Sequence, residues 1–216
     1  MNRTDVAWAI GRRTIGPAVG LLARTKVYGA ERVPMTGGVV LAANHLSWID
    51  PPVFGAACPR TVYFMAKVEA HRVPGLGEFV RLFGAFPVRR GESDRDAVRT
   101  MRQVVRDGHA LGLFVEGTRQ RSGALGKVQP GAAMVAINEE VPIVPCAIHG
   151  SHTWRLGNFH PVSVAWGTPM TFEGLPRGGK GYKEASLEVE RELASLLAWL
   201  ERIHALGRPD TATPPA

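Results

Sequence analysis

The segment VVLAANHLSWIDPP, residues 39–52, decides the fold of this chain. Its first five residues are apolar, which is typical of a strand buried on both faces of a parallel sheet. The run then ends abruptly in Asn44 and His45, and Asp50 follows five residues after the histidine. Polar side chains directly after a buried strand are expected where α/β proteins bind ligands, at the carboxyl ends of the strands.

Further apolar runs of similar length alternate with helical patterns along the chain. The predicted strands are 39–44, 62–67, 85–89, 110–116, 143–149 and 162–167. The predicted helices are 93–108, 131–140 and 183–206. This alternation predicts an α/β fold, a single domain over residues 27–207 with a largely parallel, twisted sheet flanked by helices.

Polar clusters follow four of these strands. The clusters are Asn44 with His45, Lys67, Arg89 with Arg90, and Glu116 to Arg119. Parallel strands have their carboxyl ends at the same edge of a sheet. If these strands are parallel, the four clusters are predicted to share that edge.

The two ends of the chain differ from the middle. Residues 1–26 combine apolar side chains such as Trp8 with Arg12 and Arg13. This composition predicts amphipathic helices in a membrane interface, and a helix packed on the core fits it equally well. No segment reaches the roughly 18 to 20 apolar residues of a membrane span, and the missing cleavage site argues against a secretory signal. The Pro-rich residues 208–216 are predicted to be a disordered tail.

The formal net charge of +7 favours anionic partners such as nucleic acid, acidic lipid or phosphorylated small molecules. The basic residues are spread along the chain, and no nucleic-acid-binding motif is found, so nucleic acid is not the expected partner. No dinucleotide fingerprint or P-loop occurs, so no cofactor is expected. Cys58 and Cys146 lie in apolar surroundings and are expected to be buried free thiols in a reducing compartment.

A turn through residues 46–51 can bring Asp50 back to the His45 imidazole. The carboxylate would then hold the ring in one tautomer, and the pair could act as a general base, worth about 10² to 10⁴ in rate. A structural histidine near an acid is the alternative. Ser47 is poorly spaced to be the partner nucleophile, and no G-x-S-x-G elbow occurs. A base without a protein nucleophile indicates that the nucleophile belongs to a substrate.

The second large polar cluster lies in LFVEGTRQRSG, residues 113–123. Gly117 permits a sharp turn after the strand, Thr118 offers a hydroxyl, and the planar guanidinium of Arg119 matches phosphate oxygens. An ordinary turn is the alternative.

Four blocks occur in one order along the chain. They are NHLSWID at 44–50, GAFPVRRG at 84–91, FVEGTR at 114–119 and VPIVP at 141–145. Their order resembles the four-block pattern of the glycerolipid acyltransferases, the 1-acylglycerol-3-phosphate acyltransferases and their relatives. The resemblance runs from about residue 27 to about residue 167.

This resemblance implies a glycerol-3-phosphate acyltransferase-like domain held peripherally on the cytoplasmic face of the cell membrane. Such enzymes move an acyl chain from acyl-CoA or acyl carrier protein, as co-substrate, to the hydroxyl of a lysophospholipid. The first acceptor implied is 1-acylglycerol-3-phosphate, which would give phosphatidic acid. His45 would deprotonate the hydroxyl, Asp50 would orient the imidazole, and no acyl-enzyme would form.

The resemblance also implies a set of substrate-binding residues. Those at the acceptor would be Asn44, Lys67, Arg90, Glu116, Gly117, Thr118 and Arg119, with the arginines on the phosphate. Pro142 and Pro145 would line the acyl or thioester side. The chain departs from the family where many relatives carry Phe-Lys, because Val128 and Gln129 stand there and Lys127 comes two residues early. Another lysolipid acceptor therefore stays open.

Three other interpretations stay open. A non-catalytic basic protein would bind lipid or nucleic acid with strong salt dependence and without need of His45. A hydrolase would use the same base with water as the acceptor. A metal could be bound by Cys146, His149, His152 and His160, but structural zinc sites usually need four well-placed ligands, so no metal is expected.

Overall fold

The computed structural model describes residues 3–88 and 95–215 of the chain. The strands are β1 (Lys26–Tyr28), β2 (Val39–Ala43), β3 (Val62–Lys67), β4 (Ala85–Val88), β5 (Ala110–Phe114), β6 (Ile143–His149) and β7 (Ser163–Trp166). The helices are α1 (Arg3–Leu22), α2 (Asp50–Ala57), α3 (Val68–Arg72), α4 (Leu76–Leu82), α5 (Arg95–Arg106), α6 (Gly131–Glu139) and α7 (Gly179–Ala205), with a short 3₁₀-helix η1 (Ala30–Arg32). Arg89 and Arg90, one of the predicted clusters, lie outside the described residues.

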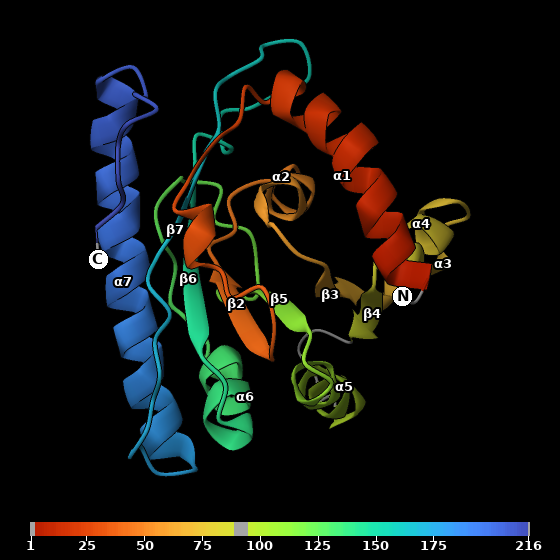
Figure 1. The fold of residues 1–216 in the computed structure, drawn as a ribbon, viewed down its shortest axis with the longest axis vertical. Coiled ribbons are helices and arrows are strands. Elements are labelled where there is room, and N and C mark those ends of the chain that lie inside the picture. Colours follow the sequence, from red (N-terminus) through yellow and green to blue (C-terminus); the bar gives the residue numbers. More distant parts are fainter. Residues whose placement is uncertain (1–2, 89–94, 216) are drawn as a thin grey trace.

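The strands form one sheet in the order β1-β7-β6-β2-β5-β3-β4 (Figure 1). Strands β2 to β6 are parallel, while β7 is antiparallel to β6 and parallel to β1. The predicted single α/β domain with a largely parallel sheet is confirmed. All six predicted strands are present within two residues of their expected bounds, whereas β1, α2, α3 and α4 were not predicted.

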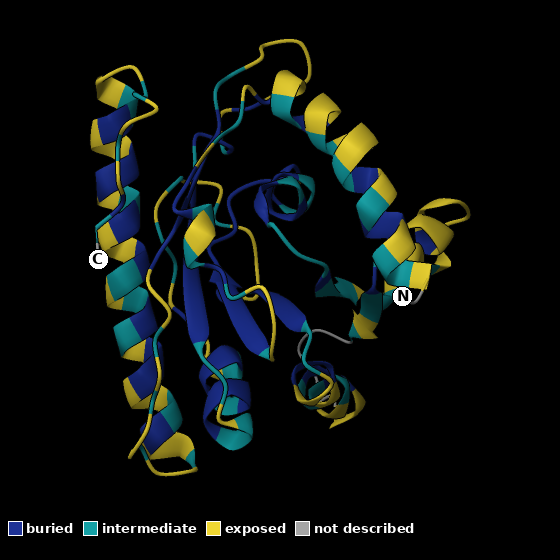
Figure 2. Cartoon of the chain, in the orientation of Figure 1, coloured by how far each residue is buried: buried dark blue, intermediate teal, exposed yellow. Residues whose placement is uncertain are grey.

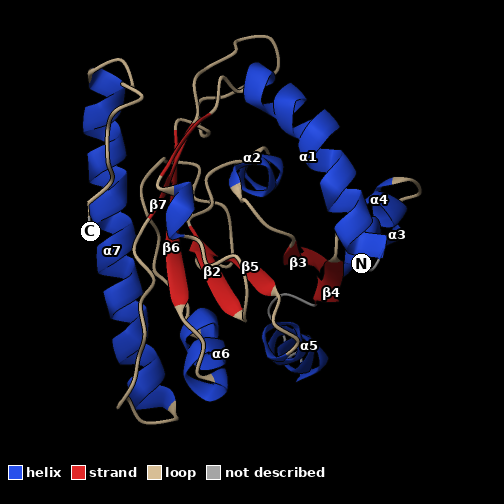
Figure 3. Cartoon of the chain, in the orientation of Figure 1, coloured by secondary structure: helices blue, strands red, loops and turns tan. Residues whose placement is uncertain are grey.

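Strand β2 runs through the centre of the sheet and is buried along its whole length. Successive side chains of a strand point to opposite faces. Val39 and Leu41 therefore pack with α1 and α2 on one face, and Val40 and Ala42 pack with α5 and α6 on the other. Helices cover both faces of the sheet (Figure 3), and α7 lies along β6 and β7.

Helix α1 packs on the domain through one side only. Trp8 donates its indole N–H to the carbonyl of Phe83 at 3.2 Å. The Trp8 ring also lies so close to α2 that a Cβ on Gly55 would be 2.7 Å from it, so this contact requires glycine. The other side of α1 is exposed (Figure 2). None of the helices in residues 3–88 and 95–215 combines the length and apolarity needed to cross a bilayer.

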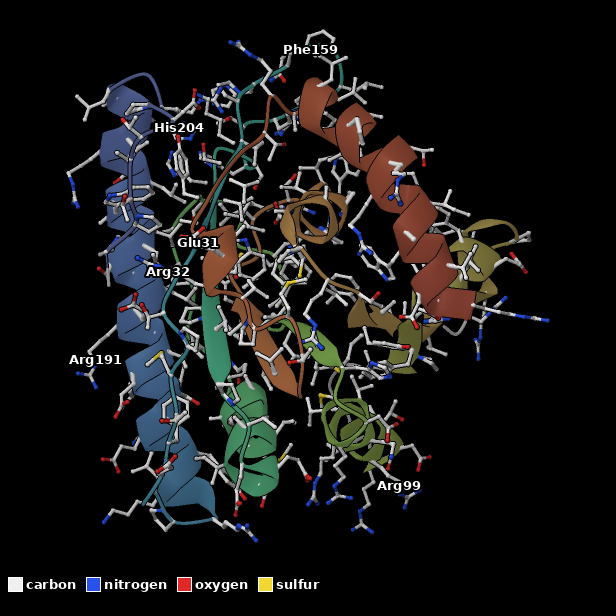
Figure 4. The ribbon with its side chains drawn as sticks, in the orientation of Figure 1. Glu31, Arg32, Arg99, Phe159, Arg191 and His204 are labelled. Atoms are coloured by element: carbon white, nitrogen blue, oxygen red, sulfur yellow. The ribbon has the colours of Figure 1, made fainter. Side chains whose placement is uncertain are left out.

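The C-terminal residues differ from the predicted disordered tail. Arg32 donates from its guanidinium to the carbonyls of Pro214 and Pro215 at 2.8 and 2.6 Å, and Lys26 pairs with Asp210 at 2.7 Å. Figure 4 shows Arg32 between the sheet and α7. The tail was predicted to be disordered because it has few apolar side chains. It is held partly through its backbone carbonyls, which are present in any sequence and leave no signal in it.

Candidate active site

The imidazole of His45 and the carboxylate of Asp50 meet in a tight turn between β2 and α2. His45 Nδ1 lies 2.9 Å from Asp50 Oδ2, and both side chains are buried. The same oxygen accepts the backbone amides of Leu46 and Ser47 at 2.6 and 2.7 Å. The turn therefore brings the carboxylate back to the ring, and the amide of Ser47 helps to hold it there.

The start of α2 explains why the chain turns so sharply. Asp50 is its first residue, and Pro51 and Pro52 follow in the first turn. An acidic side chain is stabilised at this positive end of a helix, and proline is tolerated there because first-turn amides have no acceptor within the helix. The sequence predicted a turn that returns Asp50 to the imidazole, and the structure shows that Asp50 also begins a helix.

The hydrogen bond to Asp50 decides how His45 presents its two nitrogens. A carboxylate oxygen only accepts, so Nδ1 carries the proton and Nε2 keeps its lone pair. The ring of Phe114, at the end of β5, stacks on the imidazole with 4.2 Å between ring centroids. Stacking and hydrogen bond together fix the ring and leave Nε2 as the nitrogen available to a substrate.

Glu116 connects this turn to the next loop from inside the protein. Its Oε2 accepts the backbone amide of His45 at 2.6 Å, and its Oε1 accepts that of Gly126 at 2.6 Å. Burial raises the pKa of this carboxyl above its usual range, and the two amides oppose that rise. Both carboxylate oxygens thus bond to backbone amides, and a contact of Glu116 with the acceptor stays a prediction.

Asn44 has an internal role as well. Its side-chain amide donates to the carbonyl of Ile148 at 3.0 Å, and its Oδ1 accepts the amide of Ile148 at 2.7 Å. The side chain is fully buried and replaces the backbone ladder between the ends of β2 and β6. Both polar groups of the Asn44 side chain are thus used inside the protein, and substrate binding by Asn44 stays a prediction.

Gly117, Thr118 and Arg119 form an exposed turn directly after Glu116. Gly117 has a φ of +71°, a left-handed conformation that favours glycine. A backbone hydrogen bond joins this turn to the loop that carries His45, because the backbone amide of Gln120 donates to the His45 carbonyl at 2.7 Å. The structure thus places this turn beside His45 with its side chains facing solvent.

Lys67 ends β3 and is exposed at the same sheet edge, since β3 runs parallel to β5. Gln129, at the position where the resemblance implies a lysine, lies over the turn, with its Cγ 3.9 Å from where a Cβ of Gly117 would be. The departure from the family pattern is therefore at the site itself. Arg90, expected on the same phosphate, is outside the described residues.

The two prolines of VPIVP do not line this site. The carbonyl of Pro142 accepts the amide of Val40 at 3.0 Å, which places it at the start of β2 and at the sheet edge opposite His45. Pro145 is buried within β6, and its carbonyl accepts the amide of Gly167 at 2.8 Å. Pro142 thus directly precedes β6 and Pro145 lies within it, and their role on the acyl side stays a prediction.

The residues proposed as metal ligands do not form a site. Within the described ranges, no group of three or more His, Cys, Asp or Glu side chains is arranged to hold a metal ion. Cys146 is fully buried, and burial raises the pKa of its thiol well above the usual range. His149 instead packs its ring 4.5 Å from that of His204.

Sequence reasoning missed two aromatic residues beside His45. One is Phe114, which stands directly before the EGTR block. The other is Trp48, which is 57% exposed and packs edge-on against Trp154 at 5.3 Å. For Trp48, the sequence signal was a tryptophan in a predicted turn between polar site residues.

Comparisons with known proteins identify the family of the chain. A model of the acyltransferase family matches residues 24–149. The 1-acyl-sn-glycerol-3-phosphate acyltransferase of Bacillus subtilis is 31% identical over 126 residues, which cover 58% of this chain and 62% of the relative. The protein of the same name from Streptococcus pneumoniae is 27% identical over 188 residues, which cover 85% of this chain and 70% of the relative.

The match to the Bacillus subtilis protein thus spans less than two thirds of that relative. A crystal structure of the 1-acyl-sn-glycerophosphate acyltransferase from Thermotoga maritima has the same fold, with a TM-score of 0.68 at 22% identity, over 89% of this chain and 82% of that one. The family model covers more than half of the 216 residues, including both the histidine turn and the Glu116 loop. The chain belongs to the acyltransferase family.

Proposed function

We propose that the protein transfers a fatty acyl group from a thioester to the hydroxyl of a lysophospholipid, with 1-acylglycerol-3-phosphate as the first acceptor. The observation that carries the proposal is the buried His45–Asp50 pair, 2.9 Å apart, with Nε2 left for a substrate. The names of the relatives support the choice of acceptor.

In the proposed reaction, His45 Nε2 takes the proton of the acceptor hydroxyl and Asp50 stabilises the resulting imidazolium. The hydroxyl oxygen attacks the thioester carbonyl, and the C–S bond breaks. The leaving thiolate takes the proton from His45. The products are an ester and a free thiol, so the reaction needs neither an acyl-enzyme nor a cofactor.

The exposed cations at the same sheet edge support an anionic acceptor. Arg119 and Lys67 would bind its phosphate, the arginine through paired N–H donors. Gln129 offers no charge over the Gly117 turn, so a lysolipid without a free phosphate monoester is the alternative acceptor. Replacing Gln129 by lysine should then improve kcat/KM for 1-acylglycerol-3-phosphate more than for other lysolipids.

The donor would be acyl-CoA or acyl carrier protein. Both proposed substrates carry long acyl chains, and the acceptor and product reside in a bilayer. We therefore place the protein peripherally on the cytoplasmic face of the cell membrane. The net charge of +7 supports attraction to anionic lipid.

The test is thiol release from palmitoyl-CoA by the purified chain, with and without 1-acylglycerol-3-phosphate. A parallel arm uses palmitoyl carrier protein as the donor. Release is expected only with the acceptor and should fall by at least about 10² in His45→Ala. His160→Ala, a histidine in the loop before β7, is the matched control and should keep full activity.

Other outcomes would replace the proposal. Acceptor-independent release that needs His45 would indicate a thioesterase. Undiminished release in His45→Ala would refute the proposed base. Absence of release with either donor, together with strong salt-sensitive DNA binding, would favour a non-catalytic basic protein.

A further inference from the structure

The exposed large apolar side chains are concentrated on one side of the molecule. Of the sixteen such residues in the described ranges, twelve belong to α1, to α3–α4 with the loop between them, to the His45–Asp50 turn or to the loop after Trp154. These twelve are Val6, Ile10, Ile15, Leu21, Leu22, Trp48, Val73, Leu76, Phe79, Leu82, Leu156 and Phe159. Such clustering marks an interaction surface rather than scattered surface residues.

Helix α1 is apolar on two opposite sides. Trp8 and Val19 are buried on the domain side. Val6, Ile10 and Leu21 are exposed, and at about 100° per residue they lie on the opposite side of the helix. The outer side of α1 thus combines exposed apolar side chains with Arg3 and Arg13, which is the composition of a helix that lies in a membrane interface.

Helix α4 leaves three large apolar side chains partly exposed. Leu76, Phe79 and Leu82 recur every three residues and are each nearly half exposed, while Gly77 is its one buried residue. Seven residues are too few for a helix to be stable in water without packing. α4 also touches α1, since Phe83 directly after it packs against Trp8 with 5.4 Å between ring centroids.

The opposite end of α1 meets the loop after β6. Trp154 donates its indole N–H to the Leu22 carbonyl at 3.1 Å. Leu156 and Phe159 follow in an exposed turn, and Figure 4 shows Phe159 beyond this end of α1, pointing away from the domain. Trp48 of the histidine turn packs on the same Trp154. The apolar surface therefore runs from α4 along α1 to the turn that carries His45.

We infer that α4 and the loop 154–159 join α1 in a single lipid-contacting surface that docks on an anionic bilayer. The inference rests on the proposed function, and it extends lipid contact beyond residues 1–26, where sequence alone placed it. Arg3 and Arg13 on the outer part of α1 and Arg72 beside α4 are exposed, which matches the negative headgroups of such a bilayer.

The binding test uses sedimentation of the full chain with vesicles of phosphatidylglycerol and phosphatidylcholine. Phe79→Ser/Leu82→Ser should lower the vesicle partition coefficient by at least about tenfold, because apolar area leaves the interface. The matched control is Leu187→Ser/Leu206→Ser on and directly after α7, which removes side chains at least as exposed and should bind like the wild type. Wild-type binding by the α4 variant, or equal loss in the control, would overturn the inference.

A second readout locates the histidine turn. Trp48 is exposed, whereas Trp8, Trp154, Trp166 and Trp199 are buried. Lipids brominated near the headgroup should therefore quench tryptophan fluorescence in the wild type and much less in Trp48→Phe. Equal quenching in both proteins, or none in the wild type, would place this turn away from the bilayer and contradict the inference.

Neither measurement requires turnover, so failure of this inference and failure of the proposed function are separate results. Vesicle binding that depends on α4 in a chain without transferase activity would refute the function and leave the surface. If the chain has transferase activity but the α4 variant binds vesicles like the wild type, the function is supported and the lipid-contacting surface is refuted. If that variant instead dissociates a dimer in the absence of lipid, the surface binds a second copy and the inference is wrong.

Discussion

The carboxylate of Glu116 accepts the backbone amide of His45 at 2.6 Å, although the two residues are 71 positions apart in the chain. This bond joins the loop after β5 to the loop after β2, and a second bond to the amide of Gly126 extends the connection. Two sequence blocks that look like separate parts of a site are thus one hydrogen-bonded unit, in which the acid of one positions the histidine of the other.

Removing the two hydrogen bonds of the Glu116 carboxylate, referred to below as the clamp, should lower both the free energy of unfolding and the activity. Glu116→Ala leaves the buried amide of His45 and the part-buried amide of Gly126 without acceptors, and the loss for the buried amide is about 1–3 kcal/mol of unfolding free energy. Glu116→Gln keeps an acceptor for one amide and should lose less, as measured by urea unfolding and kcat/KM. Glu190→Gln is the control, because Glu190 accepts a single backbone amide, that of Val128. Full stability in Glu116→Ala would contradict the clamp.

Asp50→Asn should impair the chemistry of His45 more than the fold. One carboxylate oxygen accepts three donors, and the other, Oδ1, is buried without a partner in the described structure. An asparagine still offers one acceptor but stabilises an imidazolium poorly, so kcat should fall by about 10² to 10⁴. Steady-state thiol release measures this loss, and a kcat within twofold of the wild type would exclude the pair as the base.

Asn44→Ala should destabilise the domain without a specific effect on KM for the acceptor. It leaves the amide and carbonyl of Ile148 unpaired between two central strands, at about 1–3 kcal/mol for each group. Thermal unfolding measures the loss, and Asn158→Ala in an exposed loop should cost less. If Asn44→Ala stays stable but raises KM, the residue contacts substrate after all.

Acid should weaken the contact between α7 and the sheet. Burial, together with the nearby His149, Arg208 and His160, lowers the pKa of His204 to about 4. The His204 ring also pairs with the Ser163 hydroxyl at 2.8 Å. Because the unfolded chain takes up this proton near pH 6.5, stability is complete above that pH and falls between pH 6.5 and 4.

Urea unfolding at pH 8 and pH 5 tests this dependence. His204→Gln should lose less stability on acidification than the wild type, because glutamine does not titrate. At pH 8 the imidazole of His204 is neutral in both the folded and the unfolded chain. The difference in stability between the wild type and His204→Gln at this pH therefore measures the effect of the substitution on packing alone. An equal loss on acidification in both proteins would assign the pH dependence to other groups, such as His149, whose pKa is also lowered by burial.

The central part of the fold was readable from sequence for a physical reason. A parallel strand buried on both faces must be an apolar run, so β2 and β6 stand out, and polar residues at the ends of parallel strands gather at one edge. Helices α2 to α4 were missed because they are short. Five to eight residues carry too little periodicity for a helical pattern to be distinguished.

The assignment of side chains at the site was harder to predict. A motif gives the residue type but not the direction in which the side chain points. Asn44 and Glu116 have the polar groups that a substrate would need, yet both serve buried backbone groups. The four-block pattern also does not say at which end of a strand a residue lies, and the structure places Pro142 at the amino end of β6.

The contacts of Trp8 with Gly55 and Phe83 have a practical consequence for protein production. A shortened version that begins after α1 would lose the cover of α2 and open the apolar layer beneath it to water. Trimming the helix to improve solubility should therefore give aggregates instead of a smaller working enzyme. Preparations that keep the helix and add a mild detergent suit this architecture better.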